Sequence, residues 1–257
     1  MKRVMLTVSY DGTNYCGWQI QPNAVTIEEK LNEALTHLTG ELTSVSGCSR
    51  TDTGVHAKCN LAVFDTNMQM PADKFSFALN QRLPEDIRIV KSQEVDLDFH
   101  PRKCETRKTY VYRIYQAKFA NPIIDRYAHF TYYSLDIEKM KEAAAYLVGE
   151  HDFKSFCSAK AQVLSTVREI YECRISEKEL EPGRLIEIKV TGNGFLYNMV
   201  RIIAGTLLEV GRGQIEPCQI HNMLENEDRQ SAGPTAPAKG LMLEKYEFSP
   251  EYSIKIY

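Results

Sequence analysis

The pattern of apolar and polar side chains divides the chain into predicted strands and helices. From Val4 to Tyr10 the two kinds of side chain alternate, which is typical of a strand with one buried face. After Thr26 the apolar residues recur at helical spacing, and Glu29 completes a capping box with Thr26, so a helix is predicted there. The same two patterns predict strands over 4–10, 43–48, 61–64, 87–95, 109–115, 166–175, 185–191 and 241–248, and helices over 27–39, 71–80, 136–147, 195–210 and after Pro217.

Two helix boundaries are predicted from glycines. Gly149 is expected to end the helix over 136–147, because glycine is the usual residue just beyond a helix C-terminus. Asn193-Gly194 is expected to open the long helix over 195–210.

The order of the predicted elements indicates the fold class. Strand, helix, strand, strand, helix and strand follow one another, and much the same order recurs after about residue 105. The sequence therefore predicts an α+β protein with two similar halves, residues 1–105 and 106–257, which together form a central mixed sheet flanked by helices, with a cleft between the halves.

Composition indicates a folded protein of one large or two ordinary domains. The chain has 257 residues, of which 43% are hydrophobic and 25% are charged. No apolar run approaches the roughly 20 residues that span a membrane, and the N-terminal pattern is not that of a signal peptide. The seven cysteines include no Cys-x-x-Cys pair, which argues against a zinc site and favours reduced thiols. We therefore expect a cytoplasmic protein with no membrane segment and no metal.

The positive charges are concentrated, although the chain as a whole is slightly acidic. The net charge is −3, with 31 basic and 34 acidic residues, which does not by itself indicate a nucleic-acid-binding protein. Five cations nevertheless fall within twelve residues, with tyrosines interleaved. Such a stretch can hold phosphates and stack on a base. The cations are Arg102, Lys103, Arg107, Lys108 and Arg113, and the tyrosines are Tyr110, Tyr112 and Tyr115.

The candidate reacting group is the carboxylate of Asp52, which lies in the stretch 46–57 between two predicted strands. Arg50, two residues earlier, can keep that carboxylate ionised and orient it. Gly54, two residues later, allows a sharp turn or a close approach to a ligand. The same residues also suit a simple surface turn, since Asp and Gly are usual turn residues. The loop alone leaves both interpretations open.

A second candidate is Arg201, a cation in the middle of an otherwise apolar predicted helix. Arginine is rarely buried without a partner, so Arg201 is expected to pair with an anion, and Asp52 is the attractive candidate. The alternative is that Arg201 lies exposed on the polar edge of an amphipathic helix. Tyr110 likewise has two interpretations, as a residue that stacks on a base or as a half-buried strand tyrosine.

Six motifs, in one order along nearly the whole chain, carry a resemblance to a known family. The most specific of them is Arg50-Thr51-Asp52-Thr53-Gly54-Val55-His56-Ala57. On these motifs the sequence resembles the tRNA pseudouridine synthase A family, the TruA family of pseudouridine synthases. The other matching motifs are Tyr10-Asp11-Gly12-Thr13 with Gly17-Trp18-Gln19, Lys108-Thr109-Tyr110-Val111-Tyr112, Gly149-Glu150-His151-Asp152-Phe153, Gly194-Phe195-Leu196-Tyr197-Asn198-Met199-Val200-Arg201 and Ala236-Pro237-Ala238-Lys239-Gly240-Leu241.

The resemblance implies a fold, an activity and a substrate. The fold is the pseudouridine synthase fold, a central mixed sheet with helices built from two similar halves. The activity is the isomerisation of uridine to pseudouridine in the anticodon stem-loop of tRNA, at positions 38, 39 and 40. Members of the family use no cofactor and no metal, and they act as homodimers. Which of the three positions and which tRNAs this chain prefers stays open.

The resemblance also implies roles for particular residues. Asp52 is implied to be the catalytic aspartate and Tyr110 the aromatic partner of the target uracil. The other implied substrate-binding residues are Arg50, Leu196 and Arg201, and the cations implied to contact RNA are Arg102, Arg107 and Lys108. Whether Asp52 attacks the sugar, adds to the base or removes a sugar proton stays open.

Two rival functions fit parts of the sequence. Asp52-Thr53-Gly54 matches the motif of aspartic proteases, but that chemistry needs two carboxylates that share a proton, and only a dimer could supply the second. The other rival is a non-catalytic RNA-binding protein on the same fold. The presence of Asp52 together with Tyr110 and Arg201 argues against it, because RNA binding alone does not require a carboxylate near phosphates.

Overall fold

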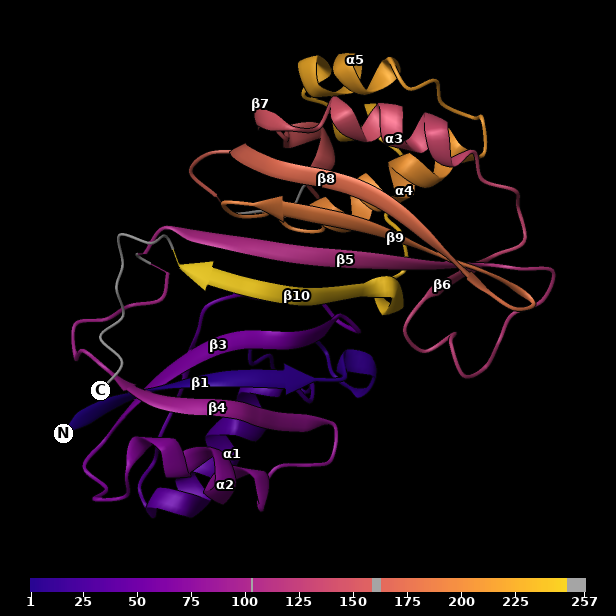
Figure 1. The fold of residues 1–257 in the computed structure, drawn as a ribbon. Helices are drawn as coiled ribbons and strands as arrows, with labels where there is room; N and C mark the ends of the chain where they lie inside the picture. The colour runs from indigo at the N-terminus through magenta and orange to yellow at the C-terminus, as the bar shows by residue number, and fades with distance from the viewer. Residues whose placement is uncertain (103, 159–162, 249–257) are drawn as a thin grey trace. The chain divides into compact units, whose positions relative to one another are not determined.

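The computed structural model describes residues 1–102, 104–158 and 163–248. This part of the chain folds into two compact units (Figure 1). The first unit contains residues 1–106 and, from the other end of the sequence, residues 243–248. The second unit contains residues 107–242. The last strand of the chain thus returns to the unit in which the chain begins.

The sheet of the first unit is antiparallel and has β1 (Lys2–Tyr10) in its interior. β1 lies between β3 (His56–Thr66) and β4 (Ile87–Val95), as Figure 1 shows. The two-residue strand β2 (Ser46–Gly47) pairs with β3, and β10 (Leu241–Phe248) follows β3 on its other side. β3 therefore has hydrogen-bonded neighbours on both sides, which makes it a rigid strand at the end of the loop that precedes it.

Two helices complete the first unit. α1 (Ile27–Thr39) begins with the predicted capping box: the backbone N–H of Glu29 donates to Thr26 Oγ1 over 3.3 Å, and the Glu29 carboxylate accepts from the Thr26 N–H over 3.4 Å. It ends at Gly40, whose φ of 75° lies in the left-handed region that favours glycine. α2 (Phe75–Asn80) contacts both α1 and β4. Both helices were predicted. α1 is confirmed, whereas α2 is shorter than the predicted helix over 71–80, because residues 72–74 form a 3₁₀ helix.

The second unit has a mixed sheet. β5 (Thr106–Gln116), β9 (Gly183–Gly192), β8 (Val167–Leu180) and β7 (Gly149–Asp152) form an antiparallel series in that order. The short strand β6 (His129–Thr131) pairs in parallel with β5.

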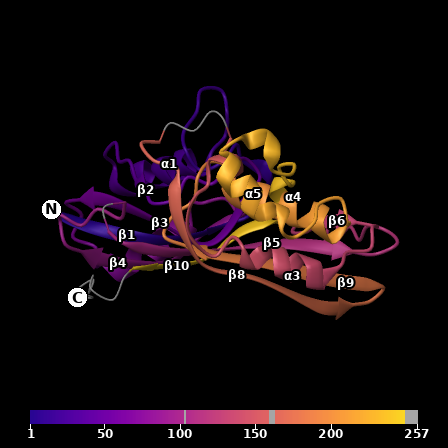
Figure 2. The ribbon, with the colours of Figure 1, turned by 90° about the horizontal axis from the view of Figure 1, so that it is seen from above.

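The helices of the second unit are α3 (Ile137–Ala145), α4 (Met199–Gly211) and α5 (Gln219–Asn226). α3 contacts both α4 and β8, and Figure 2 shows α4 and α5 close together. Eleven of the thirteen residues of α4 are buried, which explains why the sequence of this helix is apolar on nearly all sides. Short 3₁₀ helices in the described residues are Gly12–Asn14, Ala72–Lys74, Lys154–Phe156, Arg229–Ser231 and Ala238–Gly240.

Both helix boundaries that were predicted from glycines are wrong. The long helix begins at Met199 and not after Gly194, because Asn198 adopts a left-handed backbone conformation with φ of 61°, which a helix cannot contain. Gly149 does not end α3. That helix stops at Ala145, and Gly149 opens β7 with a positive φ of 112°.

The strand predicted over 43–48 is observed only over the two residues of β2. The residues before β2 form hydrogen bonds with side chains of α1 instead of with a neighbouring strand. The backbone N–H of Thr43 donates to Thr36 Oγ1 over 3.3 Å, and the N–H of Val45 donates to Asn32 Oδ1 over 2.9 Å. These N–H groups are therefore satisfied by a helix rather than by a neighbouring strand.

Candidate active site

Asp52 lies on the loop that connects β2 with β3, so the predicted strand–loop–strand arrangement is confirmed. The two strands are antiparallel, with Ser46 opposite Val63, and the N–H of Cys48 donates to the carbonyl of Leu61 over 2.8 Å. The Asp52 side chain is half-buried. A short loop closed by paired strands fixes the backbone on both sides of the carboxylate.

A buried polar network fixes the residues next to Asp52. The hydroxyl groups of Tyr10 and Thr51 lie 2.7 Å apart, and Asn60 Nδ2 donates to the Tyr10 oxygen over 3.2 Å. The same amide forms two hydrogen bonds with the backbone of Ser49. Its Nδ2 donates to the Ser49 carbonyl over 2.8 Å, and its Oδ1 accepts from the Ser49 N–H over 3.2 Å. Burial raises the pKa of Tyr10, so its hydroxyl stays protonated near neutral pH.

A second loop, residues 12–18, packs against the Asp52 loop backbone to backbone. The N–H of Trp18 donates to the carbonyl of Thr51 over 3.0 Å. Gly17 has a φ of 86°, and a Cβ at this position would lie 2.7 Å from the Thr51 carbonyl oxygen. A Cβ on Gly12 would overlap the carbonyl oxygen of Val55. Only glycine permits both approaches, so the motif Tyr10–Gln19 is a support for the Asp52 loop.

Trp18 and His56 complete that support. The indole of Trp18 is 1% exposed and covers Gly47, where any side chain would overlap it. His56 is buried at the start of β3, and its Nδ1 lies 3.0 Å from the Gly12 nitrogen and 3.1 Å from Asp11 Oδ1.

Replacing Tyr10 with phenylalanine is expected to lower the free energy of unfolding by about 1–3 kcal/mol, because the buried Thr51 hydroxyl loses its partner. Urea denaturation of the two proteins measures the difference. Tyr132→Phe is the matched control, since this tyrosine is 63% exposed and its loss should change stability by less than about 0.5 kcal/mol. Equal stability of wild type and Tyr10→Phe would show that the network does not hold the loop.

Tyr110 is a buried residue of the second unit. It lies on β5 opposite Val190 of β9 and is 8% exposed. Its ring meets that of Phe195 edge to face, with centroids 5.3 Å apart and planes at 89°. Leu196, the next residue along the turn before α4, is also buried. The second unit thus sets Tyr110 in a fixed orientation, which an aromatic contact with a base would require.

Arg201 is half-buried and is held by two hydrogen bonds within the second unit. Its Nε donates to the carbonyl of Ala236 and its Nη1 donates to Asn198 Oδ1, each over 2.8 Å. The hydroxyl of Tyr112 donates to the neighbouring carbonyl of Pro237 over 2.9 Å. Burial raises the pKa of Tyr112, and the nearby Arg201 guanidinium opposes that rise. The ion pair between Arg201 and Asp52 stays a prediction.

The remaining predicted residues are divided between the two units. Arg50 and Arg102 are exposed in the first unit, and Arg102 Nη2 donates to Ser46 Oγ over 3.2 Å. In the second unit Arg107 is exposed, with its guanidinium carbon 4.5 Å from the centroid of the Tyr171 ring. Lys108, the residue that follows it, is half-buried, and Lys103 lies outside the described residues.

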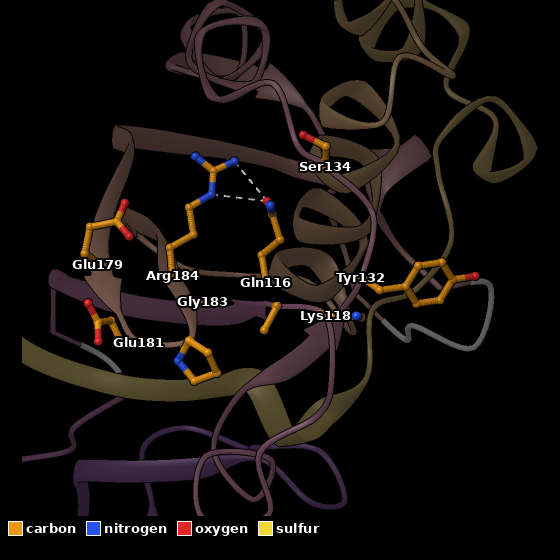
Figure 3. A pocket seen from close by; sticks show the side chains of 10 residues that line it. Gln116, Lys118, Tyr132, Ser134, Glu179, Glu181, Gly183 and Arg184 are labelled. Carbon is orange, nitrogen blue, oxygen red and sulfur yellow. Dashed lines mark hydrogen bonds between the residues drawn. The ribbon is translucent and has the colours of Figure 1, made fainter.

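One pocket of the second unit lies apart from these residues. It has a volume of about 720 Å³ and is lined in part by the connection between β8 and β9 (Figure 3). Arg184 forms one wall: its Nη2 donates to Gln116 Oε1 and to the Leu135 carbonyl, each over 2.9 Å. None of the predicted site residues lines it. The lining residues are Gln116, Ala117, Lys118, Tyr132, Ser134, Glu179, Glu181, Pro182, Gly183 and Arg184.

Two features of the described residues bear on ligands and membranes. In the part of the chain that the structure describes, no three His, Cys, Asp or Glu side chains come together as a metal site would require. Over the same residues, every helix is too short or too polar to cross a membrane.

Sequence comparison identifies the class of protein that carries this loop and these two units. A family model described as tRNA pseudouridine synthase matches residues 6–102 and 143–249, and the chain belongs to this family. Proteins named tRNA pseudouridine synthase A are similar over almost their whole length. The one from Clostridium acetobutylicum is 49% identical over 246 residues, 95% of this chain and 99% of its own length.

Two further relatives with that name agree. The protein from Ruminiclostridium cellulolyticum is 49% identical over 243 residues, which cover 95% of this chain and 98% of its own. The protein from Thermoanaerobacter sp. (strain X514) is 47% identical over 245 residues, 95% and 99% of the two chains. The resemblance inferred from the motifs is therefore confirmed, and with it an isomerase that makes pseudouridine in tRNA.

Proposed function

We propose that this protein isomerises uridine in the anticodon stem-loop of tRNA, at positions 38, 39 and 40, with Asp52 as the catalytic carboxylate. The observation that carries the assignment of Asp52 is its place on a loop held by a buried network and by close backbone contacts. A surface turn with no chemical role has no need of such support. The enzyme acts as a cytoplasmic homodimer, as the family resemblance implies.

The chemistry suits a single carboxylate. The bond from ribose C1′ to uracil N1 breaks, a bond from C1′ to C5 forms, the C5 proton leaves and N1 gains a proton, so atoms and electrons balance without an oxidant or reductant. Asp52 is ionised when it acts, whether it attacks the sugar, adds to the ring or removes a sugar proton. A guanidinium that pairs with Asp52 would favour that ionised form, and the candidates for this pairing are Arg50 and Arg201.

The target base must leave the stack before it can react. Tyr110 then provides an aromatic surface, Leu196 also contacts the substrate, and the cations Arg102, Arg107 and Lys108 contact phosphates. Binding through phosphates releases counterions, so the affinity for tRNA is expected to fall steeply as salt is raised.

Pseudouridine mapping on unmodified tRNA transcripts tests the proposal directly. Wild-type protein is expected to form pseudouridine in the anticodon stem-loop and nowhere else in the transcript. Product at another site of the tRNA would overturn the proposed positions, and no product on any transcript would overturn the proposed activity.

Tyr110→Phe is expected to keep the stacking contact and most activity, whereas Tyr110→Ala should lose about 1–3 kcal/mol of base contact. At about 1.4 kcal/mol for each factor of ten, kcat/KM of the alanine variant should fall by about 5- to 150-fold. Tritium release from tRNA labelled at uridine C5 measures both variants. Melting temperatures serve as the control for lost packing against Phe195. An alanine variant with wild-type kcat/KM would assign the stacking role to another residue.

A further inference from the structure

Asn198 is the residue that the structure adds to the candidate site. It immediately precedes α4 and has a left-handed backbone, with φ of 61° and ψ of 6°. Asparagine at the start of a helix commonly accepts a hydrogen bond from a backbone N–H of the first turn, but the Asn198 side chain makes no such bond. Its amide is therefore available for a different contact.

Both ends of that amide are used. Oδ1 accepts from Arg201 Nη1 over 2.8 Å, and Nδ2 donates to Ser158 Oγ over 2.9 Å. A flipped amide would set its NH₂ against the guanidinium, so these two partners fix which way the group points. The N–H of Ser158 also donates to the carbonyl of Tyr197 over 3.1 Å. Asn198 thus links the first turn of α4 to the chain at Ser158.

The second bond to the guanidinium comes from Ala236. Its carbonyl accepts from Arg201 Nε over 2.8 Å, and its N–H donates to the Arg201 carbonyl over 3.0 Å. A planar guanidinium held at two different nitrogens has a fixed plane and direction. Of these two supports only Asn198 is a side chain, so it alone can be removed by substitution without removing backbone.

We propose that Asn198 is a positioning residue, which orients the Arg201 guanidinium toward the carboxylate or phosphate that it supports and ties that orientation to Ser158. The proposal rests on the proposed function, in which Arg201 supports a carboxylate or a phosphate. Guanidinium groups recognise such anions through paired, directional N–H bonds, so a rotated side chain loses strength even when its charge is unchanged.

Asn198→Gly removes the side chain and leaves the backbone conformation unchanged, because glycine adopts the left-handed conformation without strain. The variant therefore measures the effect of the side chain alone. We expect kcat for tritium release from C5-labelled tRNA to fall by about tenfold, with the Kd for tRNA and the melting temperature close to those of wild type. Asn198→Asp keeps both the backbone preference and the acceptor oxygen, and it should recover most of the lost kcat. Asn23→Gly is the matched control, because Asn23 has φ of 59° and is exposed; its kcat should be that of wild type.

A double substitution tests whether Asn198 acts through Arg201. If it does, Arg201→Lys with Asn198→Gly should be no slower than Arg201→Lys alone, because a positioning residue has nothing left to orient. The inference would be overturned if the kcat of the double variant were reduced by the product of the two single-variant losses. It would also be overturned if Asn198→Gly had the kcat of wild type. Wild-type activity in Arg201→Lys and in Arg201→Ala would instead overturn the role of Arg201 in the proposed function, and the two failures are thus distinguished.

Discussion

Replacing Asp52 with asparagine is expected to reduce pseudouridine formation by about 10⁴-fold or more, with tRNA affinity within a few-fold of wild type. The substitution keeps the shape and most of the hydrogen-bonding capacity of the side chain but removes its charge and its basicity. Every route by which Asp52 can act needs an ionised carboxylate, so the loss falls on kcat. Pseudouridine mapping and tritium release from the same tRNA transcripts measure it.

The control for this variant is a carboxylate of the same unit with no role in the proposed chemistry. Asp73 is exposed and pairs with the exposed Lys74 at 3.2 Å, so Asp73→Asn should retain wild-type kcat. Filter binding of tRNA at two salt concentrations checks that Asp52→Asn still binds its substrate. Turnover of Asp52→Asn within about tenfold of wild type would remove Asp52 from the reaction, because the loss of the reacting carboxylate should reduce turnover far more than that.

The sequence was most informative where one local rule decides the structure. The capping box at Thr26 and Glu29 predicted where α1 begins, and alternation predicted β1, β4 and β5. The start of the helix after Asn193-Gly194 was misplaced by four residues because the apolar residues Phe195–Tyr197 precede those of α4 with only Asn198 between them. The helix starts only after Asn198 because that residue has a left-handed backbone conformation. The periodicity of apolar residues carries no information on a single backbone angle.

The support of the Asp52 loop could be predicted only in part. Gly12 and Gly17 were recognised as motif residues, but nothing in their spacing shows that they face the backbone of residues 51–55. Asn60 looks like an ordinary polar residue in a strand, although it is fully buried and bonds to Tyr10 and Ser49. A polar residue among the apolar positions of a central strand was the available signal, since buried amides need partners.

The resemblance supplied what physical reasoning from the residues left undecided. Taken singly, Asp52 suited a turn and Tyr110 suited an ordinary strand position. The family match now shows that both lie in a tRNA pseudouridine synthase. It does not reveal how Arg201 is oriented, because that depends on Ala236, which is 35 residues away in sequence. Contacts of this kind link distant segments and have no local pattern.

Replacing Gly205 with alanine is expected to destabilise the second unit and, through it, the candidate site. Gly205 lies in the buried part of α4, where the loop containing Pro234 and Ala236 passes so closely that a Cβ would overlap the Pro234 carbonyl oxygen. Alanine is favoured over glycine in a helix by about 1 kcal/mol, so the clash must cost more than this to destabilise the protein. A backbone carbonyl cannot move aside as the tip of a flexible side chain can, and we expect the free energy of unfolding to fall by about 3 kcal/mol in total.

The same displacement should reach Arg201. Ala236 exchanges two hydrogen bonds with Arg201, and the N–H of Gly233 donates to Thr206 Oγ1 over 3.0 Å, so a loop that moves away from α4 loses these bonds together.

Urea denaturation measures the stability, and tritium release at a temperature where the variant is folded measures kcat. Gly194→Ala is the matched control for stability, because the nearest atom to its Cβ is the flexible Arg168 side chain at 3.7 Å. A Gly205→Ala variant as stable as Gly194→Ala would show that the loop does not pack on α4 this closely. A variant that is destabilised yet keeps wild-type kcat would show that the Ala236 carbonyl is not needed to orient Arg201, and orientation would then depend on Asn198 alone.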